Sequence, residues 1–196
     1  MEPLKICGRC KKPIPWDMHF QRKRRYGIVC QRCLNKLWRA KGYQFERSLV
    51  KKLTELGFNS DRIPTSASGR VTLPDIMAFH PQKRLALGLE CKAVNDKTWT
   101  VYRDQIAKAT SYLLRHYPFD IERKVGICVK FLLGERCKSP IVIKLLNVSD
   151  NMNLEKIQDI TVSIESESDM PELTSPTLSR RSRKIRRVRA ERYSHS

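Results

Sequence analysis

The sequence predicts an α/β domain in which helices flank a mixed β-sheet, with a small four-cysteine module before it and a disordered tail after it. Three observations lead to this fold class: helical apolar stripes that alternate with period-two runs, two Cys-x-x-Cys motifs near the start, and few apolar residues near the end. The predicted boundaries are 1–40 for the module and a linker helix, 41–149 for the core, and 150–196 for an acidic linker and a basic tail.

Four of the seven cysteines form two Cys-x-x-Cys pairs separated by nineteen residues, namely Cys7, Cys10, Cys30 and Cys33. Each pair can supply two thiolates to one tetrahedral Zn²⁺ ion, which is the arrangement of a zinc ribbon. Two disulfides or four buried thiols are the alternatives, but an intracellular chain rarely keeps disulfides. We therefore predict a zinc ribbon that holds one structural Zn²⁺ per chain.

The segment between the two cysteine pairs is basic and aromatic. It contains a run of four cations, Arg22, Lys23, Arg24 and Arg25, with aromatic residues on both sides. Cations interleaved with aromatic rings suit phosphate contact combined with base stacking, so we predict a nucleic-acid contact here. The alternative is an ordinary solvated face.

Two helices are predicted after the ribbon. Residues 31–41 suit a helix, which Gly42 is expected to break, and residues 43–56 carry apolar residues spaced by four, four and three. Gly57 is placed to end the second helix. Glu46 lies at the border of its apolar stripe, where it can point toward a neighbouring strand. The alternative is an exposed helix glutamate.

The remaining core is predicted to add three strands, a helix and two strands, at 59–63, 71–79, 85–92, 103–117, 125–133 and 141–146. This order predicts a mixed sheet with helices packed on it. Residues 150–196 are rich in polar residues and end in an arginine-dominated run, so we expect them to be disordered.

The strand at 85–92 alternates between two kinds of residue. Its leucines and Cys91 share one face, whereas Glu90 and Lys92 share the other. Ala86 and Gly88 lie upstream on the Glu90 face, and we expect these small residues to leave room for a bulky partner such as a nucleic-acid backbone.

Two carboxylates at strand ends suggest phosphodiester chemistry. Asp75 and Glu90 can hold one or two Mg²⁺ ions, because hard oxygen ligands suit that metal. Lys92 can orient the attacking water or pair with the phosphate, and Glu46 can reach the metal directly or through water. An acidic residue and a lysine two positions apart also occur by chance on exposed strands. The ordered set of acidic residues and lysine is therefore stronger evidence for a catalytic site than any one of its members.

The charge distribution favours a polyanionic partner. Lys and Arg number 39 against 20 Asp and Glu, which gives a net charge of +19. The basic body, acidic connector and basic tail fit nucleic acid. Solubility or attraction to a membrane surface are alternatives. The sequence has no membrane-spanning apolar run and no signal-peptide pattern, so we expect a cytoplasmic protein, in the host cytoplasm if the source is viral.

The ordered set of Glu46, Pro74-Asp75 and Glu90-x-Lys92 resembles the motif of the PD-(D/E)xK nucleases. The sequence around this set, between residues 41 and 146, resembles that of the archaeal-type Holliday junction resolvases. The similar segments are Phe45-Glu46-Arg47, Arg62, Ser66-Ala67-Ser68-Gly69, Pro74-Asp75-Ile76-Met77-Ala78, Leu89-Glu90-Cys91-Lys92, Val101-Tyr102 and Val129-Lys130-Phe131.

The resemblance implies a restriction-endonuclease-like fold and a homodimer that binds four-way DNA junctions and makes paired, Mg²⁺-dependent nicks. It implies that Glu46, Asp75 and Glu90 ligate the metal and that Lys92 assists catalysis. It also implies phosphate contacts by Arg47 and Arg62 and a contribution from a serine of the 66–69 loop, of which Ser68 fits better than Ser66.

The ribbon and the tail depart from the compact members of this family and leave the substrate open. A nuclease of the same superfamily acting on flaps, mismatches or duplex sites is one alternative. A zinc-ribbon DNA-binding protein without catalytic activity is another, although the four retained catalytic residues argue against it.

Overall fold

The computed structural model describes residues 5–15, 20–23, 25–64, 73–132 and 139–174. Its elements in chain order are β1 (Lys5–Ile6), β2 (Pro13–Ile14), β3 (Phe20–Lys23), β4 (Gly27–Cys30), α1 (Gln31–Glu55), β5 (Asn59–Arg62), β6 (Ile76–His80), β7 (Leu85–Val94), β8 (Thr98–Val101), α2 (Arg103–His116), β9 (Glu122–Phe131), β10 (Ile141–Val148), the 3₁₀ turn η2 (Leu154–Lys156), β11 (Ile160–Ser163) and α3 (Pro171–Thr174).

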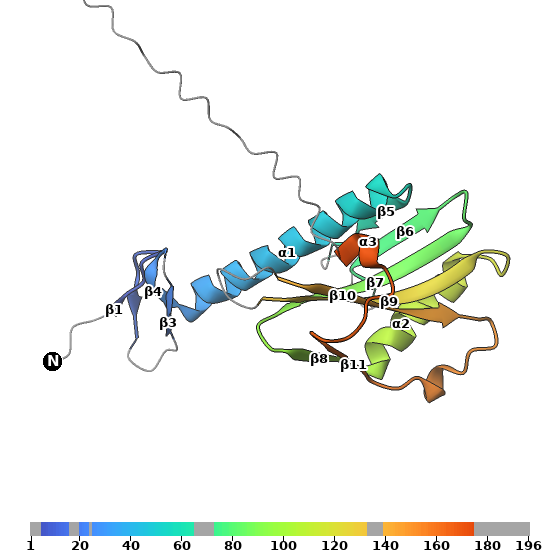
Figure 1. Cartoon of the computed structure of the whole chain (residues 1–196). Helices are drawn as coiled ribbons and strands as arrows, with labels where there is room; N and C mark the ends of the chain where they lie inside the picture. The colour runs from blue at the N-terminus through green and yellow to red at the C-terminus, as the bar shows by residue number, and fades with distance from the viewer. Residues whose placement is uncertain (1–4, 16–19, 24, 65–72, 133–138, 175–196) are drawn as a thin grey trace, which may run out of the picture.

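The core is a five-stranded mixed sheet in the order β10-β9-β7-β6-β5. Strands β7 and β9 run parallel, and the other neighbouring pairs run antiparallel. Helix α1 lies on one face of the sheet and α2 on the other (Figure 1). The predicted fold class, a mixed sheet flanked by helices, is therefore confirmed for the core.

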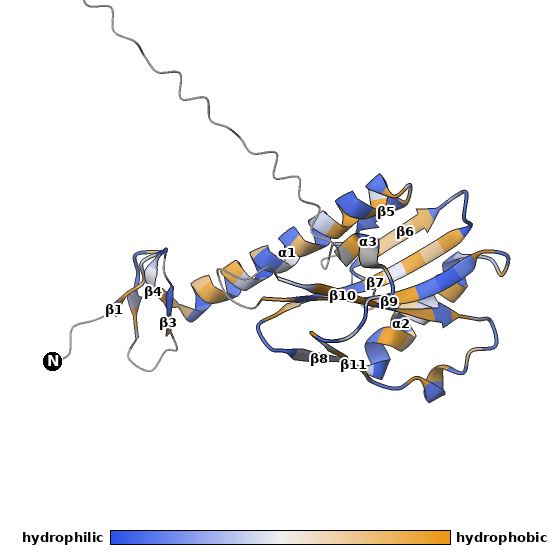
Figure 2. Cartoon of the chain, viewed as in Figure 1, coloured by the Kyte–Doolittle hydropathy of each residue, from blue (hydrophilic) through white to orange (hydrophobic). Residues whose placement is uncertain are grey.

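The helices cover the two apolar faces of the same central strands. Colouring by hydropathy shows the apolar character of the sheet between them (Figure 2). On the α1 face, Phe45, Leu49 and Leu53 pack against Leu87 and Leu89. On the other face, α2 packs over Ala86, Val125 and Ile127, among other residues. This burial on both faces fixes the central strands rigidly in the domain.

The face of β7 that was expected to stay open for a bulky partner is closed upstream of Glu90. Ala86 is fully buried, and a side chain added at Gly88 would meet Leu113 of α2 at 3.5 Å. The expectation was wrong because β7 and β9 are parallel, so the chain must cross over the sheet between them and places α2 on this face.

Helix α1 is continuous, so the predicted break at Gly42 is also wrong. One glycine costs a helix about 1 kcal/mol, which the burial of both helix ends outweighs. Cys33 and Leu34 are buried in the ribbon, and Phe45 is buried in the core. The predicted end near Gly57 is confirmed, since α1 stops at Glu55 and Gly57 has a positive φ of 89°.

Several strand predictions need adjustment. Strand β6 begins at Ile76, immediately after Asp75 and not at residue 71. The short strands β8 and β11 pair antiparallel and were not predicted, because each has only four residues, several of them polar. No described helix is both long and apolar enough to cross a membrane.

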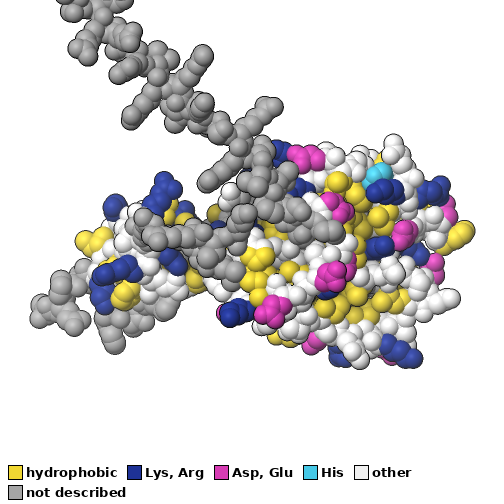
Figure 3. Space-filling view, viewed as in Figure 1, with side chains coloured by type: hydrophobic (Ala, Val, Ile, Leu, Met, Phe, Trp, Pro, Cys, Tyr) yellow, Lys and Arg dark blue, Asp and Glu magenta, His cyan; other side chains and the backbone are white. Residues whose placement is uncertain are grey.

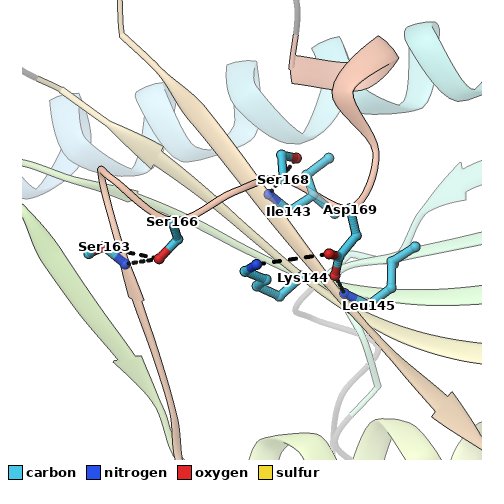
Figure 4. Close-up of polar contacts among 7 residues, drawn as sticks. All are labelled: Ile143, Lys144, Leu145, Ser163, Ser166, Ser168 and Asp169. Atoms are coloured by element: carbon cyan, nitrogen blue, oxygen red, sulfur yellow. Dashed lines mark hydrogen bonds and ion pairs between the residues drawn. The ribbon is translucent and has the colours of Figure 1, made fainter.

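The prediction of disorder is wrong for residues 150–174, which fold back onto the core. Met170 and Leu173 are buried against the α1 side of the sheet. The segment also binds the outer edge of β10: the Ser168 Oγ and Asp169 Oδ2 atoms accept hydrogen bonds from the amides of Ile143 and Leu145 at 3.1 and 2.5 Å (Figure 4). The polar composition of this segment favours disorder. Its hydrogen bonds to an otherwise open sheet edge and its two buried apolar side chains outweigh that tendency. The basic run of the tail lies outside the described residues.

We predict that Leu173→Ala lowers the free energy of unfolding by about 2–5 kcal/mol, because it removes a fully buried side chain from the core. Urea unfolding followed by circular dichroism measures this change. Leu56→Ala, at a position 37% exposed, is the matched control and should change stability by about 0.5 kcal/mol or less. Equal effects of the two substitutions would show that the segment is not docked.

Candidate active site

The register between β6 and β7 brings the two strand-end carboxylates together. Ile76 pairs with Leu89 in an antiparallel ladder, so Asp75 lies beside Glu90, one position further along. The backbone amide of Cys91 donates a hydrogen bond to Asp75 Oδ2 at 2.8 Å. Asp75 is therefore fixed at the point where it leads into β6.

Glu90 is held in an environment that disfavours its charge. Burial, and then the neighbouring charge of Asp75, raise the pKa of Glu90 to about 8, although Lys92 acts in the opposite direction. Burial and the charge of Asp75 therefore both disfavour the ionised form of Glu90 in the protein alone. A bound cation beside Glu90 would favour that form.

Glu46 reaches the site from α1, where it is 9% exposed. Glu46 lies at the margin of the apolar stripe of this helix, as predicted from the sequence, and directly follows the buried Phe45. Arg62 Nη1 donates to Glu46 Oε2 at 3.1 Å, and the same guanidinium lies 4.7 Å from the ring centre of Tyr43. Glu46 therefore already has a cationic partner, contributed by β5.

An open cleft of about 620 Å³ joins these groups. It lies between the middle of α1 and the end of β7, and its lining residues are Trp38, Arg39, Gly42, Tyr43, Glu46, Asp75, Cys91, Lys92 and Ala93. Glu90 instead lines a small closed space on the α2 side of β7, which it shares with Lys92 and Trp99. Lys92 thus borders both spaces.

The structure brings Glu46, Asp75 and Lys92 to one cleft and places Glu90 directly beside it. Arg47 is exposed on α1 next to Glu46. Arg62 contacts Glu46 through Nη1, so part of its guanidinium is already engaged within the site. Ser66, Ser68 and Arg24 lie outside the described residues.

Sequence reasoning missed Trp38, Arg39 and Tyr43 as residues of the cleft. The available signal was helical spacing: Arg39 and Tyr43 precede Glu46 by seven and three residues, so they share its side of the helix. The expected break at Gly42 concealed this relation. Because Gly42 has no side chain, it leaves the cleft open beside Glu46, whose Oε1 lies 3.9 Å from where a Cβ would stand.

The donor set in and beside the cleft suits a divalent metal ion. Asp75 and Glu90 offer hard carboxylate oxygens, and a cation beside them would favour the ionised form of Glu90. Among the described residues, however, these acids do not converge into a closed ligand cluster, whereas the cysteines do.

The four ribbon cysteines form that cluster. Their Sγ atoms all lie within 4.8 Å of one another, and those of Cys10 and Cys30 are 3.9 Å apart. Four thiolates around Zn²⁺ with bonds of about 2.3 Å would stand about 3.8 Å from each other, so the geometry fits a tetrahedral ion. The cysteines come from the start and end of the β1–β4 region and the first turn of α1.

The surroundings within the ribbon shift the pKa values of two of its thiols in opposite directions. Burial acts to raise the pKa of Cys7, but the backbone amides of Cys10, Cys30 and Arg9 outweigh it and lower that pKa to about 6. Burial and then the neighbouring thiols raise the pKa of Cys33 to about 12. A metal ion would remove the cost of holding several thiolates together.

The predicted basic contact surface lies on the ribbon. Arg22 and Lys23 belong to β3, and Arg25 lies 5.4 Å from the ring centre of Tyr26 in the following turn. The described residues of the ribbon include no Asp or Glu. Figure 3 shows Lys and Arg side chains on this part of the molecule, whereas acidic side chains lie on the core.

Comparison with known proteins covers most of the chain. The family model described as archaeal Holliday junction resolvase (Hjc) matches residues 38–173. A protein of Sulfolobus acidocaldarius named crossover junction endodeoxyribonuclease Hje is 30% identical over 125 residues, which are 64% of this chain and 78% of that protein. The protein of the same name from Saccharolobus islandicus is 39% identical over 72 residues, 37% of this chain and 52% of that one.

A solved structure of Archaeoglobus fulgidus Hjc, described as a Holliday junction resolvase, matches with a TM-score of 0.40 and 19% identity over 63% of this chain and 84% of that one. The family match includes Glu46, Asp75, Glu90 and Lys92 and also the folded-back segment up to residue 173. The chain belongs to the archaeal Holliday junction resolvase family.

Proposed function

We propose that this protein is an endodeoxyribonuclease that resolves four-way DNA junctions by paired, Mg²⁺-dependent hydrolysis of phosphodiesters. The observation that carries the proposal is the cleft that joins Glu46, Asp75 and Lys92 next to Glu90 in a chain of this family. The proposed site of action is the cytoplasm.

In the proposed mechanism, Asp75 and Glu90 would hold Mg²⁺, and Glu46 would be a third ligand. The bound ion would neutralise charge on the scissile phosphate and lower the pKa of the attacking water. The ammonium group of Lys92 donates hydrogen bonds to the phosphate or to that water from the edge of the cleft. The Cys91 amide keeps Asp75 oriented during this chemistry.

Arg62 has a second role in this proposal. If Glu46 held the metal, the Arg62 guanidinium would be free to bind a DNA phosphate, for which its planar donors are well suited. Arg47, exposed on α1 directly after Glu46, contributes a further phosphate contact. The 66–69 loop supplies a serine near the scissile group, with Ser68 preferred over Ser66.

The proposed assembly is a homodimer. A four-way junction has two-fold symmetry, and two opposed nicks require two active sites related by that symmetry. Zn²⁺ has a structural role in the proposal: it holds the ribbon together, and the cations Arg22, Lys23, Arg24 and Arg25 contact DNA.

We predict that Lys92→Ala lowers the rate of junction cleavage about 100-fold or more while changing the Kd for the junction by only a few fold, because Lys92 acts on the reacting phosphate. Cleavage of an immobile four-way junction is measured with Mg²⁺ and with chelator. Lys51→Ala, an exposed lysine on α1, is the control and should cleave normally.

The same assay separates the alternatives by including a flap and a linear duplex of matching sequence. Symmetric cuts confined to the junction support the proposal. Equal cutting of flap or duplex would favour a different nuclease of the superfamily, and junction binding without Mg²⁺-dependent cleavage would favour a non-catalytic DNA-binding protein.

We predict one Zn²⁺ per chain in freshly purified protein, and its loss in Cys10→Ser, because three thiolates close the tetrahedral site poorly. Mass spectrometry under native conditions and elemental analysis measure the zinc content. Cys128→Ala, which removes a thiol of β9 outside the cluster, should keep the metal. Zinc-free wild-type protein would contradict the ribbon assignment.

We predict that Glu90→Gln stabilises the metal-free protein by about 1–3 kcal/mol at pH 8. The pKa of Glu90 is about 8 in the folded protein against about 4.5 in the unfolded chain, so wild-type stability falls as pH rises through this interval. Urea unfolding in chelator between pH 4 and 9 measures the difference, which should grow with pH. Parallel curves for both proteins would contradict the raised pKa of Glu90.

A further inference from the structure

One face of the exposed half of α1 carries a regular stripe of three cationic residues and a tyrosine. Arg32, Lys36, Arg39 and Tyr43 follow one another at spacings of four, three and four, and Glu46 comes three residues later. Residues at these spacings lie one above another on a helix. The stripe thus begins near the ribbon and ends at a residue of the proposed active site.

Contacts at its inner end show which way the stripe faces. Arg39, Tyr43 and Glu46 all line the cleft, and Arg32 and Lys36 are exposed on the same side of the helix further out. Figure 1 shows this half of α1 running between the ribbon and the sheet. The cleft therefore continues outward as a basic surface of the helix.

The charge of this half-helix has one sign only. From Gln31 to Phe45 the chain has four basic residues, the three of the stripe and Lys41, and no Asp or Glu. A helix face exposed only for solubility commonly mixes both signs, which form pairs at spacings of three and four. The C-terminal half of α1 follows that rule, since Lys51 and Glu55 form an ion pair at 3.8 Å.

The stripe is also held at a fixed distance from the catalytic residues. Cys33 and Leu34 anchor the outer end of α1 in the ribbon, and Arg9 Nη1 donates to the Cys33 carbonyl oxygen at 3.1 Å. Phe45 and Leu49 anchor the inner end in the core. The fourteen helical steps from Arg32 to Glu46 span about 21 Å at 1.5 Å per residue, which is the length of about 6 base pairs of duplex.

We propose that this stripe is a binding track for the duplex arm that leaves the active site, and that Arg32 and Lys36 contact arm phosphates about 3–7 base pairs from the cleaved bond. This inference rests on the proposed function. It assigns DNA contacts to α1 itself, in addition to those of the ribbon and the catalytic cleft, and makes the helix a rigid spacer between them.

The test combines a protein variant with a DNA variant. Wild type, Arg32→Gln with Lys36→Gln, and the control Lys51→Gln bind two immobile junctions in chelator. One junction has ordinary arms, and the other has neutral methylphosphonate linkages about 3–7 base pairs from the cleavage site. Zinc content and thermal unfolding of the double variant establish that the ribbon and the core remain intact.

The expected result is a roughly tenfold loss of affinity for the double variant on the ordinary junction, with a slope of log K against log salt that is shallower by about 2. Methylphosphonate should weaken wild type and Lys51→Gln but add little to the double variant, because both changes remove the same contacts.

The binding track is overturned if the affinity losses from the protein variant and from methylphosphonate are additive, or if the double variant has the same salt slope as wild type. The proposed function still stands in that case, provided that wild type cleaves junctions with Mg²⁺. If wild type neither prefers nor cleaves junctions, both the proposed function and the track are overturned. Faster dissociation of the double variant from linear duplex alone, with normal junction binding, also overturns the track.

Discussion

The packing of α1 against one face of the sheet is the constraint on which the rest of the structure depends. Phe45, Leu49 and Leu53 are fully or almost fully buried against β7, and this burial fixes the rotation of the helix about its axis. Once that rotation is set, Glu46 must lie at the margin of the sheet, and the stripe that ends there must face the cleft. The same helix determines where the ribbon stands, because its first turn supplies Cys33 to the cysteine cluster.

The electrostatics of the site favour a change when a cation arrives. In the protein alone, burial and the charge of Asp75 disfavour the ionised form of Glu90, and Glu46 is paired with Arg62. A divalent ion would favour ionised Glu90 and would compete with Arg62 for Glu46. The cost of ionising Glu90 is tolerated because the buried faces of β7, packed under both helices, hold the carboxylates in register.

Much of the core could be predicted because its signals are local. The period-two alternation in residues 85–92 correctly predicted that Cys91 lies on the opposite face of the strand from Glu90 and Lys92. The apolar stripe of the helix correctly predicted that Glu46 lies at its border. Other features depend on contacts distant in sequence. The cover that α2 provides over Gly88 follows from the parallel pairing of β7 and β9, which no local pattern reveals.

The same reasoning explains the two larger errors. Gly42 favours a helix break locally, but the ribbon and the core hold the helix at both ends and keep it continuous. Residues 150–174 are rich in polar residues, which favours disorder. However, Leu173 is buried and Asp169 accepts a hydrogen bond from a backbone amide of β10. In each case a few long-range contacts outweigh the local preference of the chain, which for the glycine is about 1 kcal/mol.

Phosphate contacts along α1 and on the ribbon do not distinguish a junction from ordinary duplex, because the backbone charge is common to both. Such contacts are also equal in the bound substrate and in the transition state, so they add affinity without accelerating the chemical step. In the proposed homodimer, preference for junctions must therefore arise from the angle at which two arms enter two cleavage sites. The continuous helix α1 would hold the ribbon in one orientation to the cleft, whereas a flexible linker would let the ribbon follow any duplex.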